Sequence, residues 1–570
     1  MDDGRGRLVT GEEVPWPPPP REPGPWNGGP PVAPPGNTPL PPLPGQGGVV
    51  HGAAAQSNPW ANPSGAPEPL NGPNVAPLGG YPSAAPVPPR SDPFPGLPSG
   101  PGLVDRAPVW VLVASAVVVL AVIAGAAFVV IKGGRQYPSA WDDKSAPIAK
   151  WVSENRQLEF DHPVKVNFLT PEEYKARATE GGDSESVESK QFYADQVAQL
   201  RALGFVSGDV DLAAANDTLS DSGTLAFYDP DTEQVYVRGT ELTPGIRVTL
   251  AHELTHVLQD QNFDLQRFDD LPSGQASVLR ALAEGDATKV EDLYVEKQLT
   301  DDEQKAYDEE SSSAGDDATE EIEDKVPSFL TTTFAAPYIL GPRFVDFLYA
   351  TDEWKAIDEA LQEPPTEEAM FDPITYQTDA GAQKTVEIDA PAGTEVLESD
   401  EFGPTTWYLL LASRLGEKEA LAAVDGWGGD QYVVYREDDV VCMDATIEGD
   451  TPEDEAELAK ALGEWAAKSP KGTAEVTNEG GAVQFHSCDP GKDAKAVGEE
   501  VTPDFLGLPV TRTDLFTSGI EDDATPKQAA CFANGIIDAF TIDQLNDPKG
   551  TFVNSQEGQV LIAGVRDTCA

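Results

Sequence analysis

A His-Glu-x-x-His motif inside an otherwise uncharged stretch constrains this chain more than any other feature of its sequence. From Val248 to Leu258 the only ionisable residues are His252, Glu253 and His256. Residues i and i+4 of a helix share one face, so two imidazoles at these positions can bind one Zn²⁺ ion. A buried helix admits such polar groups where a metal compensates them. The stretch therefore predicts a zinc-binding helix in which Glu253 acts on a metal-activated water.

The position of a third metal ligand decides which kind of zinc site this is. The metzincin extension HExxHxxGxxH is excluded, because Gln259 and Asn262 occupy its glycine and third-histidine positions. Residues 275–294 predict a second helix, in which Glu284 is flanked by small and apolar side chains. The third ligand is therefore expected downstream of the motif rather than inside that extension.

Several segments around the motif carry a resemblance to known proteins. The most specific are HELTHVLQDQNFDL (His252–Leu265), LAEGDAT (Leu282–Thr288) and FYDPDTEQVYV (Phe227–Val237). Weaker similarity is found in PYILGPRFV (Pro337–Val345), EPPTEE (Glu363–Glu368) and DGWGGDQYVVY (Asp425–Tyr435). The chain resembles the gluzincins, thermolysin-like zincins in which a helix after the HExxH helix supplies a glutamate ligand. More closely, residues 145–465 resemble membrane-anchored or secreted metallopeptidases of actinobacteria.

This resemblance implies a fold, a cofactor and a set of site residues. The fold is an α+β zincin-like domain, with a mixed sheet beside the HExxH active-site helix. The cofactor is Zn²⁺, and Glu253 is the general base. The metal ligands that the resemblance implies are His252, His256 and Glu284. Asp264 and Asp286 are alternatives to Glu284.

The chain departs from the thermolysin-like pattern on the side opposite the zinc, where those enzymes place a tyrosine and a histidine. The remaining histidines are His51, His162 and His486. The first lies in the tail, the second precedes the motif, and the third lies two residues from Cys488, which favours a structural role. Tyr338 is therefore the candidate for stabilising the oxyanion, with Tyr294 as the alternative.

Two further features complete the expected site. Glu291 follows Glu284 by seven residues on the same helical face, and it is the candidate for orienting a ligand histidine. The segments Leu225–Asp229 and Gln234–Arg238 predict a β-hairpin. We expect the strand Gln234–Arg238 to form a sheet edge to which an extended peptide substrate adds.

The first 131 residues differ in composition from the rest of the chain. Residues 1–106 hold 29 of the 52 prolines with little apolar periodicity, which predicts a disordered tail with polyproline II stretches. The tail is interpreted as a solvated spacer, although runs such as Pro17–Pro20 suit a proline-recognising partner. Residues 107–131 contain no charged side chain and are long enough to cross a bilayer. A transmembrane helix is therefore expected over 107–131.

Charge and cysteine positions bear on partners and topology. With 38 basic and 97 acidic residues the net charge is −59, which excludes nucleic acid as a partner. The residues flanking the span are more basic on its C-terminal side, which alone favours a cytoplasmic C-terminal part. All four cysteines lie beyond the span, however, which favours an oxidising exterior. We expect a single-pass cell-membrane protein with a cytoplasmic N-terminus and an extracytoplasmic C-terminal domain. The preferred disulfides, as the more local pairing, are Cys442–Cys488 and Cys531–Cys569.

These features predict a division of the chain and a function. The expected parts are a disordered tail (1–106), a transmembrane helix (107–131), a zincin-like catalytic core (145–300), an acidic surface loop (301–325), the rest of the metallopeptidase-like domain (326–465) and a disulfide-containing α/β C-terminal region (466–570). The loop is expected because residues 301–325 carry 12 acids and 2 lysines among Ser, Ala and Gly. The expected function is that of a membrane-tethered extracytoplasmic zinc endopeptidase. The alternative is a non-catalytic zincin-fold scaffold or binding protein of the cell envelope.

Overall fold

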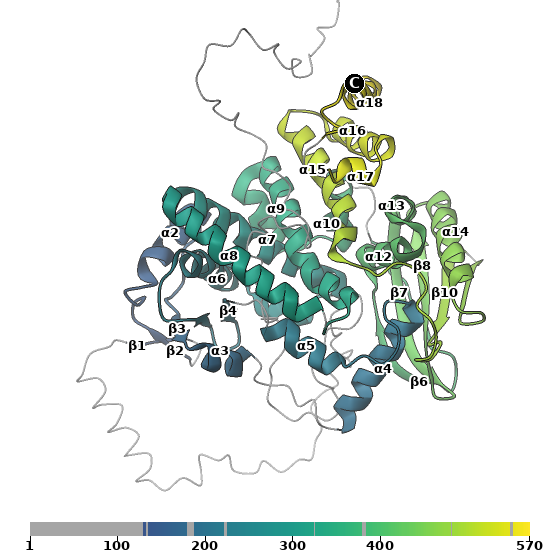
Figure 1. Cartoon of the computed structure of the whole chain (residues 1–570), viewed down its shortest axis with the longest axis horizontal. Helices are drawn as coiled ribbons and strands as arrows, with labels where there is room; N and C mark the ends of the chain where they lie inside the picture. Colours follow the sequence, from purple (N-terminus) through teal and green to yellow (C-terminus); the bar gives the residue numbers. More distant parts are fainter. Residues whose placement is uncertain are drawn as a thin grey trace, which may run out of the picture. The chain divides into compact units, whose positions relative to one another are not determined.

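The computed structural model of the chain divides into two compact units, each described by itself (Figure 1). One unit comprises the described residues within Pro41–Thr513, and the other those within Asp514–Ala570. The residues that the structure describes are 129–132, 135–178, 187–221, 225–323, 325–378, 383–479, 481–547 and 551–569. Helices and strands both occur in the Pro41–Thr513 unit, which is therefore an α+β fold.

A three-stranded mixed sheet lies beside the helix that carries the HExxH motif. Its strands are β3 (Lys165–Leu169), β4 (Ala226–Asp229) and β5 (Gln234–Arg238), in the order β3-β5-β4. The predicted hairpin is confirmed, because β4 pairs antiparallel with β5. The predicted edge strand is wrong: β3 pairs parallel with the other side of β5, so β5 is central and β4 is an edge.

The crossover between β3 and β5 is helical, as a parallel pair requires a long connection. Its helices are α3 (Pro171–Ala178), α4 (Val187–Leu203) and α5 (Leu212–Asp221). The helices around the motif are α2 (Ala146–Arg156), α6 (Pro244–Phe263), α7 (Ser273–Gln298), α8 (Asp301–Glu323) and α9 (Ser328–Gln362).

The motif helix α6 forms where the sequence gives a strong start signal. The Thr243 side chain accepts a hydrogen bond from the Ile246 N–H, and Pro244 occupies the first turn. Every residue from Val248 to Leu258 is buried, as the uncharged stretch predicts. The helix is therefore part of the core, and its three ionisable groups are enclosed with it.

Helices α7 and α9 pack in unusually close contact. A Cβ atom added at Gly285 would lie 2.4 Å from the Gly341 carbonyl oxygen, and one added at Gly341 would lie 2.1 Å from the Ala281 carbonyl oxygen. Only glycine allows two helix backbones to approach this closely. The close approach brings α9 against the segment of α7 that contains Glu284.

The predicted acidic loop at 301–325 is wrong, because residues Asp301–Glu323 form helix α8. Acidic side chains in the first turn favour a helix N-terminus, and Thr300 and Glu303 form reciprocal capping hydrogen bonds there. Contacts with α6 also stabilise α8: Arg247 pairs with Glu303, and the Glu310 carboxylate accepts the Gly245 N–H at 2.8 Å. Not all acidic side chains of α8 are therefore simply solvated: Glu303 and Glu310 bind groups at the N-terminal end of α6.

The same unit also contains a five-stranded antiparallel sheet. Its strand order is β6 (Glu395–Asp400), β7 (Trp427–Glu437), β8 (Val440–Gly449), β10 (Ala482–Cys488) and β9 (Ala474–Glu479). The helices in this part of the chain are α10 (Glu367–Phe371), α11 (Pro373–Thr378), α12 (Gly403–Leu415), α13 (Glu417–Val424) and α14 (Pro452–Lys468). Asp430 ties the layers together, because its carboxylate accepts the indole N–H groups of both Trp407 and Trp427 at 2.9 Å.

The C-terminal unit is helical over its described residues. It contains the end of α15 (Gly507–Glu521), and then α16 (Pro526–Ala539), α17 (Ile542–Leu545) and α18 (Gln556–Cys569). The disulfide Cys531–Cys569 joins α16 to α18, and Cys442–Cys488 joins β8 to β10 in the other unit. Both predicted pairings are confirmed, whereas the expected mixed α/β character of the last hundred residues is limited to β9 and β10.

The predicted transmembrane helix is contradicted by the structure. Across the described ranges, no helix combines the length and the apolar character that a bilayer crossing needs. The last residues of the predicted span lie in strand β1 (Val129–Lys132), which pairs antiparallel with β2 (Arg135–Pro138). The β-branched Val129, Val130 and Ile131 favour a strand. Residues 107–128 and the predicted disordered tail at 1–106 lie outside the described residues. The predictions of a single-pass membrane topology and of a cell-membrane localisation are therefore wrong.

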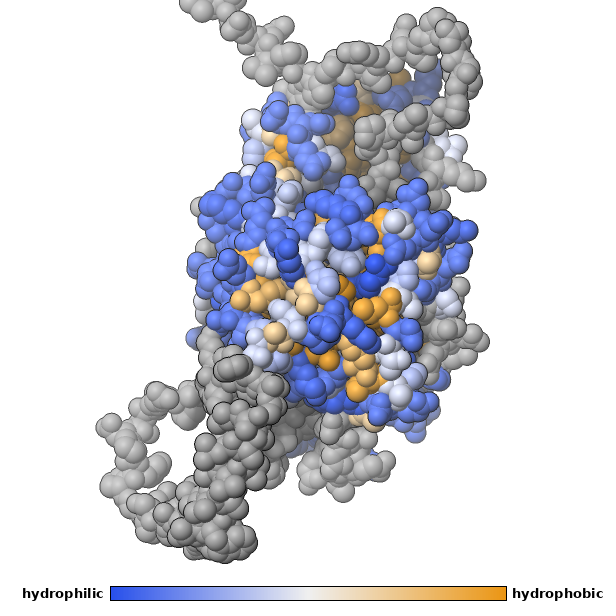
Figure 2. Space-filling view, turned by 90° about the vertical axis from the view of Figure 1, so that its left-hand side faces the viewer, coloured by the Kyte–Doolittle hydropathy of each residue, from blue (hydrophilic) through white to orange (hydrophobic). Residues whose placement is uncertain are grey.

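The surface agrees with the acidic composition. Figure 2 shows a face on which hydrophilic residues dominate and apolar patches are small and separated. The large apolar residues exposed on the described part of the chain are Tyr376, Val396, Val440, Val560 and Leu561.

Candidate metal centre

Helices α6 and α7 bring three metal-ligating side chains together in the core. His252 and His256 lie one turn apart on α6, and Glu284 lies on α7. The Glu284 Oε2 atom is 3.3 Å from His252 Nε2 and 3.4 Å from His256 Nε2. One potential ligand atom from each residue lies within 4.8 Å of the other two, and all three residues are buried. Two imidazole nitrogens and one carboxylate oxygen are a donor set that suits Zn²⁺.

Hydrogen bonds at the far side of each imidazole determine which nitrogen faces Glu284. The Glu291 carboxylate accepts from His252 Nδ1 at 3.0 Å and from the Tyr307 hydroxyl at 2.9 Å. Because a carboxylate only accepts hydrogen bonds, His252 Nδ1 donates to Glu291, and Nε2 is the nitrogen that faces Glu284. The predicted orienting residue Glu291 is therefore in contact with the candidate ligand His252, and Tyr307 of α8 is its second partner.

Gln259 orients the His256 ring in the same way that Glu291 orients the His252 ring. Its Oε1 accepts from His256 Nδ1 at 2.9 Å, while its Nε2 donates to the Ala283 carbonyl at 3.0 Å and to Asp286 at 2.9 Å. These two acceptors fix the orientation of the Gln259 amide, so His256 also carries its proton on Nδ1. Both Nε2 atoms therefore face the same Glu284 oxygen.

A buried ion-pair network supports Gln259 from behind. The Arg156 Nε atom contacts Asp286 Oδ1 at 2.6 Å, and its Nη2 contacts Asp358 at 2.5 Å. The side chains of Arg156 and Asp286 are completely inaccessible to solvent. Asp286 is therefore committed to Arg156 and Gln259, which removes it as an alternative to Glu284. The other alternative, Asp264, is the exposed C-cap residue of α6.

Glu253 is fully buried next to the two ligand histidines. Burial raises the pKa of its carboxyl group, while His256 and His252 act in the opposite direction. A backbone hydrogen bond from Tyr228 reaches the carboxylate, so the edge strand β4 borders the site. The Tyr228 hydroxyl donates to Asp260 at 2.6 Å and so attaches β4 to the same helix. A carboxylate in this environment is suited to accepting and returning a proton.

The environment of Glu284 differs from that of Glu253. Burial opposes its ionisation, but the charges and hydrogen bonds of His256 and His252 outweigh that effect and lower its pKa to about 2. The Tyr338 hydroxyl on α9 donates to the other oxygen, Glu284 Oε1, at 3.1 Å. Tyr338 therefore lies at the site. The alternative, Tyr294, instead packs edge-on against Trp151.

The histidines outside the motif lie elsewhere. His162 contacts Gln261 at 2.7 Å and Glu233 at 3.1 Å, and His486 lies on β10 in the five-stranded sheet. His51 lies outside the described residues. Sequence reasoning missed Gln259 and Tyr307. The spacing of Gln259, three residues after His256 on the same helix, is the signal that would have indicated the first.

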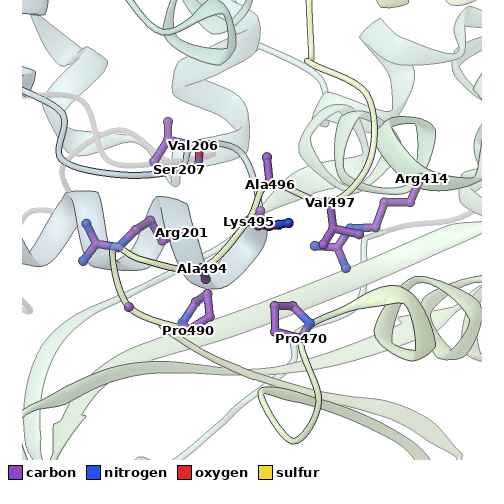
Figure 3. A pocket seen from close by; sticks show the side chains of 12 residues that line it. Arg201, Val206, Ser207, Arg414, Pro470, Pro490, Ala494, Lys495, Ala496 and Val497 are labelled. Carbon is purple, nitrogen blue, oxygen red and sulfur yellow. The ribbon is translucent and has the colours of Figure 1, made fainter.

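A small basic pocket lies apart from this centre, beside α4 and the segment that follows β10 (Figure 3). Its volume is about 20 Å³, and three of its lining residues are the cations Arg201, Arg414 and Lys495. Burial lowers the pKa of Arg414 to about 10, and its guanidinium stacks on Trp465 at 3.7 Å. No histidine or carboxylate lines the pocket, and the volume is too small for a peptide. It is therefore not the candidate active site.

Comparison with known proteins assigns one region of the chain. Residues 393–502 match the model of a family described as a domain of unknown function (DUF8575). This region contains the five-stranded sheet and helices α12 to α14, not the HExxH helix. No curated protein matches the chain, and no solved structure matches it. The match names no activity, so the functional argument depends on the chemistry of the buried site.

Proposed function

We propose that this protein is a zinc-dependent peptidase. The observation that carries the proposal is the convergence of His252 Nε2, His256 Nε2 and a Glu284 oxygen in a buried site next to the Glu253 carboxylate. The resemblance of the flanking segments to thermolysin-like zincins adds support for peptide hydrolysis as the reaction. The fit of the donor set to zinc is independent of that resemblance.

In the proposed reaction, His252, His256 and Glu284 hold the ion. When bound, Zn²⁺ supplies Lewis acidity and lowers the pKa of water. The Glu253 carboxylate takes the proton from the attacking water and delivers it to the leaving amine nitrogen. Its burial keeps this carboxylate out of bulk solvent, so the proton stays between the water and the amine. The Tyr338 hydroxyl is positioned to donate to the developing oxyanion if it exchanges its bond to Glu284 Oε1 for one to the substrate.

We place the substrate beside β4 rather than beside β5. β4 is an edge of the three-stranded sheet, and its Tyr228 backbone contacts Glu253. An extended peptide that adds to this edge would carry its scissile carbonyl past Glu253. The strongly negative chain, with its net charge of −59, should attract neutral or cationic peptides more than anionic ones.

The test measures metal content and peptide hydrolysis on the same preparations of the full chain. The parent protein should bind about one zinc per chain and cleave members of a peptide library. Glu253→Gln should keep the zinc and lose about 10² to 10⁴ in rate, because it removes the base without removing a ligand. Glu296→Gln is the matched control, because Glu296 is an exposed glutamate at the end of α7.

Two outcomes would contradict the proposal. If Glu253→Gln cleaves peptides as fast as the parent, Glu253 is not the base. If the parent binds zinc and cleaves no member of the library, the protein is a scaffold with a metal site and not an enzyme.

A further inference from the structure

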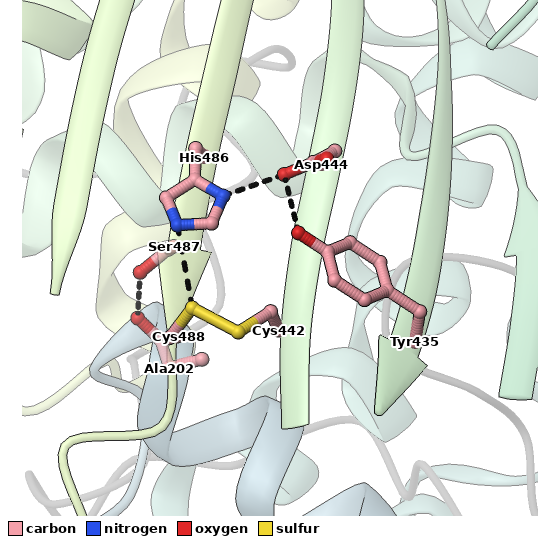
Figure 4. Close-up of a disulfide and its surroundings, with 7 residues drawn as sticks. All are labelled: Ala202, Tyr435, Cys442, Asp444, His486, Ser487 and Cys488. Carbon is pink, nitrogen blue, oxygen red and sulfur yellow. Dashed lines mark hydrogen bonds and ion pairs between the residues drawn. A yellow bond between two sulfur atoms is a disulfide. The ribbon is translucent and has the colours of Figure 1, made fainter. Parts of the chain in front are cut away.

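A histidine and a carboxylate stand beside the disulfide of the five-stranded sheet (Figure 4). Cys442 on β8 and Cys488 on β10 are directly paired across the two strands. His486 Nε2 is 3.3 Å from the Cys488 sulfur, and His486 Nδ1 is 2.6 Å from Asp444 Oδ1. The Tyr435 hydroxyl donates to the same Asp444 oxygen at 3.2 Å. The result is a continuous chain of contacts from a carboxylate through an imidazole to a disulfide sulfur.

The surroundings of His486 favour its protonated form. The hydrogen bond to Asp444 raises the pKa of His486, against the smaller effect of burial, and the charges of Asp444, Glu475 and Glu437 act in the same direction as the bond. Glu475 is the residue on β9 directly paired with His486. A protonated imidazole next to a cysteine stabilises the thiolate.

The other disulfide has no such neighbour. Within the described part of the chain, neither Cys531 nor Cys569 forms a hydrogen bond through its sulfur with a titratable group, and the bond simply links α16 to α18. The two sulfurs of the sheet disulfide also differ from each other. Cys442 is 3% exposed, whereas Cys488 is only partly buried and the His486 side chain is 42% exposed. A reagent can therefore approach Cys488 from the side of the imidazole.

We infer that Cys442–Cys488 is a redox-active disulfide that exchanges with dithiols, and that Asp444 and His486 stabilise the Cys488 sulfur when it is released. The substrate class is a small or protein dithiol in the reducing direction and its disulfide in the oxidising direction. This activity is separate from the proposed peptidase, because none of its residues belongs to α6 or α7.

The exchange proceeds in two balanced steps. One thiolate of the dithiol attacks the Cys488 sulfur, the bond to Cys442 breaks, and the Cys442 sulfur leaves with the electron pair and takes up a proton. The second thiolate of the dithiol then attacks its own partner sulfur in the mixed disulfide. The Cys488 sulfur leaves as a thiolate beside His486, which holds the second proton. The dithiol is oxidised to a disulfide, and the two protein sulfurs gain its two electrons.

The test compares the two disulfides within one molecule. The full chain is equilibrated at neutral pH in mixtures of reduced and oxidised dithiothreitol, quenched by alkylation and digested for mass spectrometry. The Cys442–Cys488 bond should be half reduced at a ratio of reduced to oxidised dithiothreitol at least about tenfold lower than the Cys531–Cys569 bond, because one pKa unit of thiolate stabilisation favours the reduced form about tenfold. Equal midpoints for the two disulfides would overturn the inference.

Variants separate the role of His486 from simple exposure of the bond. His486→Gln keeps a polar side chain of similar size and should remove the difference between the two reduction midpoints, and Asp444→Asn should reduce it. Lys492→Gln is the matched control, because Lys492 is an exposed residue four positions after Cys488 in the sequence and pairs with Asp209. In the reduced protein, His486→Gln should also shift the pH profile of Cys488 alkylation upward by about one unit. An unchanged reduction midpoint and an unchanged profile in His486→Gln would reject the inference, even if the bond itself is labile.

Discussion

The described part of the chain contains two histidine-centred clusters with different chemistry. His252, His256 and Glu284 form one, and Cys442, His486 and Cys488 form the other; in each, the potential ligand atoms lie within 4.8 Å of one another. In the helical cluster every member is buried, and both histidines have Nδ1 committed to an acceptor. In the sheet cluster two members are only partly buried, and the two sulfurs are bonded to each other.

The difference shows that proximity alone does not define a metal site. The helical cluster has three independent potential ligands, with the Glu253 carboxylate, the proposed base, beside them. In the sheet cluster, two of the three potential ligands, Cys442 and Cys488, are joined by a covalent bond. Asp444 orients His486 toward the Cys488 sulfur. The same residue types therefore point to hydrolysis in one place and to electron transfer in the other.

The largest expected effect comes from removing ligands from each cluster in turn. Glu284→Ala should reduce zinc affinity by about a hundredfold or more, because three protein ligands leave no spare partner. The double variant Cys442→Ser and Cys488→Ser should keep the full zinc content. Elemental analysis after dialysis against a weak chelator measures both. Zinc lost from the double variant and retained in Glu284→Ala would reverse the assignment of the two clusters.

A smaller effect is expected from the residues that orient the ligand histidines. Gln259→Ala and Glu291→Ala should each weaken zinc binding by about 10- to 100-fold, because the imidazole loses the acceptor that fixes its tautomer. Glu291→Gln should restore most of the affinity, since the amide oxygen can still accept from His252 Nδ1. Competition with a chromogenic chelator gives the affinities.

The control for this series is Glu296→Ala, which removes an exposed glutamate from the same helix. Its affinity for zinc should equal that of the parent. If Gln259→Ala also binds zinc like the parent, the hydrogen bond between Gln259 and His256 has no role in preparing the site.

Sequence patterns anticipated the helical cluster better than the sheet cluster for a physical reason. The motif on α6 and the seven-residue spacing of Glu284 and Glu291 on α7 are local, so helix periodicity places them on common faces. The supports of Gln259 are not local, because Asp286 and Arg156 come from other helices. The pairing of His486 with Asp444 likewise depends on the register between β8 and β10.

Tertiary contacts also explain the incorrect predictions. The hairpin was recognisable, but the addition of β3 to the outer side of β5 is a long-range pairing that no local pattern specifies. The acidic segment at 301–325 has the composition of a solvated loop, yet Tyr307 and Glu310 contact the α6–α7 pair and stabilise helix α8. The transmembrane expectation depended on apolar composition at 107–131 alone, and the described end of that segment is a strand.

The smallest expected effect is on stability and concerns Glu367 of α10. This residue lies between helix α7 of the helical region and helix α12 of the sheet region. Its Oε1 atom accepts the Thr405 N–H of α12 at 3.3 Å, and Glu367 also packs near Gly274 at the start of α7. Burial raises the pKa of Glu367 to about 7. The folded chain therefore keeps a proton that the unfolded chain releases near its ordinary pKa of about 4.3, so the stability contributed by this group is present at low pH and is lost as pH rises toward 7.

Glu367→Gln should consequently flatten the pH dependence of stability. Between pH 5 and pH 7 the free energy of unfolding of the parent should fall relative to this variant by about 1 kcal/mol per pH unit, the slope expected for one proton. Denaturant unfolding of both proteins at each pH measures the difference, in which the titration of all other groups cancels. Glu363→Gln, at an exposed glutamate just before α10, should leave the parent slope unchanged. If Glu367→Gln also follows the parent, Glu367 is ionised in the folded chain, and the contact between the helical and sheet regions does not depend on its proton.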